Sequence, residues 1–237
     1  MNDKDTSRRR FLTGMATAVS GIALSGGLVS YASPVLAQTA AASLDDYSTL
    51  FFDEVEWRFI VAACDRLIPA DDEGPGALIA NVPVFIDQQM QTDYAGGGLW
   101  YMSGPFLPSS APEFGYQYKF TPRDIYRFGI ADVDTWCMDK DGKVFADLEK
   151  ARQTEILKQL EDGSIELPTV PARVFFGQLL SNTREGFFAD PMYGGNRDMV
   201  GWKMIGFPGA RGDYGDFIHQ HNRPYTQAPV SIKSKRG

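Results

Sequence analysis

Residues 121–138, TPRDIYRFGIADVDTWCM, carry the clearest helix signature of the chain. The Thr121 hydroxyl can accept a hydrogen bond from a free backbone N–H, Pro122 suits the first helical position, and Asp124 lies three residues after the cap. Apolar residues then recur at helical spacing: Ile125, Phe128 and Trp136. We therefore expect a helix from residue 122 to about residue 138.

Four more segments show helical periodicity, namely residues 53–68, 81–90, 144–161 and 171–185. Pro69 should end the first of them. Asn81 is a candidate cap for the second, with Pro83 in its first turn. Gly163 is a natural stop after the third. The sequence predicts a mainly α fold of about five helices.

The segments between and after these helices are unusual. Residues 92–120 and 186–237 are rich in glycine, proline and aromatic residues, with little periodicity. Loops this long inside a domain are uncommon and are often functional. We expect residues 38–237 to form a single helical domain with long irregular loops.

The N-terminus has a different character. Residues 7–13, SRRRFLT, resemble the twin-arginine export signal, with Arg8, Arg9, Phe11 and Leu12 at its pattern positions. A weakly apolar, glycine-containing stretch follows, and Ala37 ends a plausible cleavage site. The alternative is a basic N-terminus that contains two arginines by chance. Residues 1–37 are interpreted as a signal peptide, which predicts a periplasmic protein.

Composition narrows the class of partner. The whole chain is 43% hydrophobic and 22% charged, which is typical of a globular protein. Residues 38–237 carry 19 basic and 28 acidic side chains. An acidic chain without a basic tract repels phosphate backbones, so nucleic-acid binding is not expected.

Motifs for cofactors are missing from the sequence. It has no Cys-x-x-Cys-His for haem attachment, and two cysteines are too few for an iron–sulfur cluster. The glycines at 96–98 lack a nucleotide-binding spacing. His219 and His221 fit a polar surface tail better than a metal site. We expect no catalytic, cofactor-binding or metal-binding residue in this chain.

Cys64 and Cys137 both lie on predicted apolar helix faces. In an oxidising compartment they are candidates for one intramolecular disulfide. Two buried free thiols, or a bridge to a partner subunit, are the alternatives.

Several blocks of sequence resemble one family. They are residues 64–71 (CDRLIPAD), 74–77 (GPGA), 84–87 (VFID), and 186–209 (GFFADPMYGGNRDMVGWKMIGFPG). They are similar to the small subunit of membrane-bound gluconate 2-dehydrogenase, the subunit 3 family. The likeness extends over about residues 50–210.

This resemblance implies a non-catalytic subunit. Its partner would be a glucose–methanol–choline-type flavoprotein that holds FAD and oxidises a sugar or sugar acid. A multihaem cytochrome c would carry the electrons onward and associate the complex with the periplasmic face of the inner membrane. The resemblance brings no catalytic residue to this chain. The chain would stabilise the flavoprotein and escort it through export of folded proteins.

The glycine-rich block after residue 186 is the candidate interface, because aromatic residues are enriched at the centres of protein interfaces. The residues assigned to it are Phe187, Phe188, Asp190, Tyr193, Asn196, Trp202 and Phe207. The alternative is that these rings pack on the helical core.

Two other functions fit the sequence. In a free-standing periplasmic sugar-binding protein, the aromatic loops would stack on sugar rings. In an independent enzyme, carboxylates would act as acid and base.

Overall fold

The computed structural model describes residues 44–233, so the predicted export signal and cleavage site, Arg8 to Ala37, lie outside the described residues. The predicted mainly α fold is confirmed. Six α-helices and no sheet are present between residues 44 and 233. The helices are α2 (Glu54–Leu67), α3 (Val82–Gln89), α4 (Pro122–Asp141), α5 (Lys150–Asp162), α6 (Ala172–Phe188) and α7 (Val200–Ile205).

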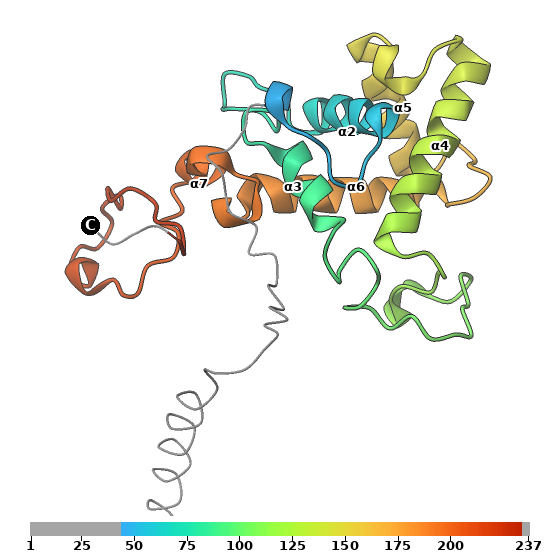
Figure 1. Cartoon of the computed structure of the whole chain (residues 1–237). Helices are drawn as coiled ribbons and strands as arrows, with labels where there is room; N and C mark the ends of the chain where they lie inside the picture. The colour runs from blue at the N-terminus through green and yellow to red at the C-terminus, as the bar shows by residue number, and fades with distance from the viewer. Residues whose placement is uncertain (1–43, 234–237) are drawn as a thin grey trace, which may run out of the picture. The chain divides into compact units, whose positions relative to one another are not determined.

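Helix α6 is the central element. It packs against α3, α4 and α5, while α2 lies against α3 and α5 (Figure 1). At the crossing of α4 and α6, a Cβ on Gly129 would lie 2.2 Å from the Phe175 ring. A glycine there lets the two helices approach closely.

The core is aromatic where these helices meet. The ring centroid of Phe59 lies 4.5 Å from that of Phe145 and 5.8 Å from that of Phe175. The Tyr126 ring contacts Phe52 with a centroid distance of 5.5 Å. These five side chains are buried, which is the main source of stability for such a core.

The caps explain where two helices begin. Thr121 and Asp124 form the predicted capping box at the start of α4, with Pro122 as its first residue. Asp53 and Glu56 form a second capping box at α2. Asn81 behaves differently from the prediction: it precedes α3 in the left-handed conformation (φ 57°), and its side chain makes no capping bond.

The helix expected over residues 144–161 is broken, and this expectation was wrong. A 3₁₀ turn spans Phe145–Asp147, Leu148 is extended, and α5 begins only at Lys150. The Asp134 carboxylate accepts a hydrogen bond of 2.8 Å from the Phe145 N–H. That bond and the burial of Phe145 in the core hold the turn apart from the helix.

The C-terminal part of the chain is more ordered than predicted. Phe187 and Phe188 belong to the last turn of α6, not to a loop, and Trp202 lies in α7. Helix α7 is short and lacks an apolar stripe. Its position depends on tertiary contacts, which periodicity does not report.

Two buried carboxylates attach segments to the helices. The Asp87 carboxylate in α3 accepts hydrogen bonds from the Tyr47 hydroxyl and from the N–H groups of Leu50, Phe51 and Phe52, at 2.7 to 3.0 Å. Asp132 in α4 accepts bonds from the Thr169 N–H and hydroxyl, just before α6. Such bonds offset the cost of burying a carboxylate.

Residues 92–120 form the irregular aromatic segment that the sequence predicts. The Trp100 ring lies 4.7 Å from the Tyr116 ring and 6.1 Å from the Tyr94 ring, centroid to centroid. Across residues 44–233, none of the helices is both long and apolar enough to cross a membrane.

Candidate partner-binding surface

The predicted interface residues gather where α6 ends, in the turn after it, and in α7. Four of the seven have their side chains buried within the chain: Phe187, Asp190, Asn196 and Trp202. The other three side chains are exposed, with exposed fractions of 39% for Phe188, 47% for Tyr193 and 44% for Phe207. The sequence block therefore divides into a buried support and an exposed surface.

Asn196 organises the support. It adopts the left-handed conformation (φ 45°), and its side-chain amide donates a hydrogen bond to the Ala189 carbonyl at 2.9 Å. Its side-chain oxygen accepts a bond from the Gly201 N–H in α7 at 2.8 Å. A Cβ on Gly201 would lie 2.2 Å from the Phe187 carbonyl oxygen, so glycine is required for this close approach.

Asp190 attaches the C-terminal segment to the turn after α6. Its carboxylate accepts hydrogen bonds from the Met192 N–H at 3.0 Å, the Ser231 hydroxyl at 2.6 Å and the Ile232 N–H at 2.8 Å. Ser231 and Ile232 lie about forty residues further along the chain, so one side chain joins the end of α6 to the C-terminal segment.

The exposed rings rest on buried ones. Phe188 meets Phe187 edge-to-face with a centroid distance of 5.1 Å, and Phe207 meets Trp202 in the same way at 5.2 Å. Met204 and Ile205 of α7 add further exposed apolar side chains between them in the sequence. Exposed apolar side chains that rest on buried rings are of the kind enriched at the centres of protein interfaces.

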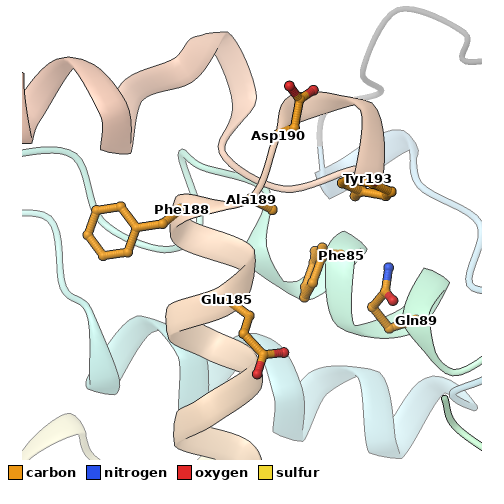
Figure 2. Close-up of a pocket in the computed structure, with 7 residues that line it drawn as sticks. All are labelled: Phe85, Gln89, Glu185, Phe188, Ala189, Asp190 and Tyr193. Carbon is orange, nitrogen blue, oxygen red and sulfur yellow. The ribbon is translucent and has the colours of Figure 1, made fainter. Parts of the chain in front are cut away.

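A groove of about 440 Å³ adjoins this surface. Its lining comes from α3, the last turn of α6 and the turn after it, as Figure 2 shows. The lining residues are Phe85, Gln89, Glu185, Phe188, Ala189, Asp190 and Tyr193. Phe188, Asp190 and Tyr193 were named from the sequence. Phe85 lies in the motif at residues 84–87, but nothing in the sequence placed Phe85, Gln89 or Glu185 beside them.

Both carboxylates that line the groove already have hydrogen-bond partners. Glu185 accepts hydrogen bonds from the Asn182 amide and the Ser181 hydroxyl, both at 2.9 Å, and Asp190 is occupied as described above. No nucleophile lies beside a base among its lining residues. In the described part of the chain, no group of three or more His, Cys, Asp or Glu side chains is placed to hold a metal ion.

Two tyrosines with raised pKa values have structural roles. Burial raises the pKa of Tyr126 well above its usual value; its hydroxyl donates to the Asn182 side chain at 3.0 Å. Burial also raises the pKa of Tyr94, whose hydroxyl accepts a bond from the Asn182 amide. Through Asn182, these hydrogen bonds connect α4 and α6 to the segment of residues 92–120.

Both cysteines are buried free thiols in the structure. The Cys64 sulfur lies 3.7 Å from the Thr183 hydroxyl. Burial raises the pKa of each thiol to about 12. A bridge between Cys64 and Cys137, or from either of them to a partner subunit, stays a prediction.

The surface and the groove lie within the part of the chain that a family model recognises. The model that describes gluconate 2-dehydrogenase subunit 3 matches residues 54–209. The chain belongs to the gluconate 2-dehydrogenase subunit 3 family. No curated protein and no solved structure gives a significant match to the chain.

Membership of the gluconate 2-dehydrogenase subunit 3 family makes this chain one subunit of a larger dehydrogenase assembly. An exposed apolar surface is then expected, because a subunit must bury part of its surface against its partners. The matched range starts at the beginning of α2 and ends just after Phe207, so it includes every residue of the groove.

Proposed function

We propose that this chain is the non-catalytic small subunit of a periplasmic FAD-dependent dehydrogenase complex, and that it stabilises and escorts the flavoprotein subunit. The observation that carries the proposal is the family match over a domain whose exposed rings, Phe188, Tyr193 and Phe207, stand on a buried support. The partner is a glucose–methanol–choline-type flavoprotein with FAD, and a multihaem cytochrome c with haem c receives the electrons.

Export supports the same proposal. A flavoprotein must fold around FAD before it leaves the cytoplasm, so one partner needs a signal for folded proteins. This chain has Arg8 and Arg9 in the twin-arginine pattern. The assembled complex would then lie on the periplasmic face of the inner membrane, held there through its cytochrome.

Copurification tests the escort role. The chain is co-expressed with the flavoprotein of the same source, and the double variant Phe188→Ser/Tyr193→Ser is compared with the wild type. Phe128→Ser on α4 is the control, because Phe128 has a similar exposed fraction of 42%. The proposal expects the wild type and the control to copurify with an FAD-containing subunit and the double variant to lose it.

The purified chain alone should be colourless and inactive with sugars and an artificial electron acceptor. A stoichiometric flavin or haem spectrum from the lone chain would contradict the proposal. So would a wild-type chain that leaves the flavoprotein behind during purification.

The lining of the groove also fits a second candidate function, that of a sugar-binding protein. Aromatic walls at Phe85 and Tyr193 with Gln89 and Glu185 beside them resemble the mixed lining of small-molecule sites. Calorimetric titration of the lone chain with gluconate and glucose separates the two functions. Saturable binding together with no flavoprotein partner would favour the binding protein.

A further inference from the structure

The C-terminal arm, residues 206–233, is a second feature that a partner can recognise. The arm follows α7, and in Figure 1 it extends to one side, away from α2, α4 and α5. The family match ends at residue 209, where the arm begins its loop. Residues 210–233 of the arm therefore lie outside the part that the family model matches.

The arm is closed at its base. Gly209 and Val230 form an isolated parallel bridge; the Ala210 N–H donates to the Val230 carbonyl at 2.7 Å, and the Val230 N–H donates to the Pro208 carbonyl at 3.2 Å. Asp190 fixes the following residues through Ser231 and Ile232. Both ends of the loop are thus attached to the family domain.

Inside the loop, Tyr225 forms a hub. Its ring centroid lies 4.7 Å from that of Phe217 and 5.7 Å from that of Tyr214, and the Arg211 guanidinium lies 5.3 Å from the same ring. The hydrogen bonds at the base of the loop and the ring contacts around Tyr225 reduce the conformational entropy of the unbound loop. Less entropy is then lost when it binds.

Charge distinguishes the arm from the rest of the chain. The arm carries three basic and two acidic side chains, and residues 234–237 add Lys235 and Arg236, whereas residues 38–205 carry 14 basic and 26 acidic side chains. Several basic residues of the helical domain, among them Arg58, Arg127 and Arg152, already pair with its own carboxylates. The arm therefore lacks the net negative charge of the helical domain.

The arm exposes apolar, aromatic and basic side chains. The Ile218 side chain is 64% exposed, and Tyr214, Arg223 and Ile232 are also exposed. Exposed tyrosine, arginine and aliphatic side chains on a glycine-containing loop are typical of recognition loops.

We propose that the arm docks on an acidic, apolar surface of the flavoprotein subunit and so forms a second contact, separate from the groove. This inference rests on the proposed function. A protein surface fits better than a lipid surface because the chain belongs to a subunit family, and a subunit buries part of its surface against other subunits. Two contacts on one partner also strengthen each other through effective concentration.

The test measures binding of the purified chain to the purified flavoprotein at low and at moderate salt. The arm variant is Ile218→Asp/Arg223→Glu, which changes two exposed side chains outside the hub. The control is Met138→Asp/Lys158→Glu, which makes the same kinds of change on α4 and α5, where both side chains are exposed. Thermal unfolding of each variant checks that the fold is kept.

We expect the arm variant to bind about tenfold more weakly at low salt, and the control to bind within about twofold of the wild type. The wild-type affinity should fall as salt rises, and that of the arm variant should change less. An arm variant that binds as tightly as the wild type would overturn the inference while leaving the proposed function intact.

Other occupants give other results. Arm-dependent cosedimentation with vesicles of phosphatidylglycerol, with flavoprotein binding unchanged in the arm variant, would assign the arm to lipid and overturn the inference. An arm-dependent dimer of this chain, again with unchanged flavoprotein binding, would also overturn it. A wild type that does not bind the flavoprotein at all would overturn both the inference and the proposed function.

Discussion

The indole N–H of Trp202 donates a hydrogen bond of 2.7 Å to the backbone carbonyl of Phe188. Phe188 is the last residue of α6, where helix carbonyls have no partner within the helix. Trp202 lies in α7, so this bond joins the end of the central helix to the shorter one. It also fixes the backbone of Phe188, one of the residues that line the groove.

Replacing the Trp202 indole tests how much this hydrogen bond between α7 and α6 contributes to stability. Trp202→Phe keeps an aromatic ring but removes the donor, and we expect the free energy of unfolding to fall by about 1–2 kcal/mol from the lost bond and ring volume. Urea denaturation measures the change. Trp136→Phe on α4 is the control and should cost less, because the Trp136 side chain is only half-buried. An equal loss in both variants would show that the Phe188 bond adds nothing.

A second prediction concerns the buried carboxylate of Asp87. Each of its oxygens accepts two hydrogen bonds, from Tyr47 and Leu50 on one side and from Phe51 and Phe52 on the other. Asp87→Asn places an amide donor against two donors, so we expect a loss of about 3 kcal/mol in unfolding free energy. Tyr47→Phe removes one donor only and should cost about 1 kcal/mol.

The control for this pair is Asp72→Asn, which changes an exposed carboxylate before α3. Thermal unfolding of the three variants should rank them with Asp87→Asn least stable and Asp72→Asn close to the wild type. If Asp87→Asn proved as stable as the wild type, the residues before α2 would not depend on this carboxylate.

The cysteines give a third prediction. Burial raises the pKa of both Cys64 and Cys137 to about 12, so at pH 8 the thiolate fraction in the folded chain is on the order of one in ten thousand. The folded chain should resist iodoacetamide, and unfolding without a reductant should allow two labels. Mass spectrometry counts the labels, and a denatured chain that takes none would show a disulfide.

The same two thiols give stability a pH dependence. Their folded pKa values lie above the ordinary value of about 8.5, so their contribution is complete below about pH 8.5 and is lost as the pH rises toward 12. Cys64→Ala should therefore lose less stability than the wild type between pH 8.5 and the alkaline limit of measurement. Thermal unfolding at several pH values checks the sign.

The sequence predicted well those elements whose signals are local. The capping box at Thr121 and Asp124 and the glycine stop at 163 act within a few residues, and the structure has both. The break at Leu148 depends on Asp134, which lies in another helix, so periodicity over residues 144–161 could not reveal it. Helix α7 depends in the same way on Asn196 and on the close approach of Gly201 to Phe187.

The candidate surface was predicted in composition but not in arrangement. An aromatic side chain in a glycine-rich block has the same signature whether it packs inward, as Phe187 and Trp202 do, or outward, as Phe188 and Tyr193 do. What decides is the extension of α6 to Phe188 and the hydrogen bond from Trp202. Glu185 and Gln89 were missed because only the packing of α3 on α6 brings them to one groove.

The last prediction tests the escort role in cells. Replacing Arg8 and Arg9 by Lys keeps both positive charges but removes the planar guanidinium groups, which offer a different set of donors. If the export machinery recognises this pair, the variant should stay in the cytoplasm. A flavoprotein without a signal of its own should then stay there too, with FAD bound. Periplasmic dehydrogenase activity should be lost, while cytoplasmic activity with an artificial electron acceptor persists.

Cell fractionation followed by assay of both compartments measures this. The control replaces Lys158 by Arg on α5, a change of the same size in an exposed side chain of the helical domain, and it should leave export unchanged. A free-standing binding protein predicts a different outcome, because only this chain would then change compartment. Since the escort role makes the partner's location depend on this chain, periplasmic dehydrogenase activity at the wild-type level, with the variant chain found in the cytoplasm, would contradict it.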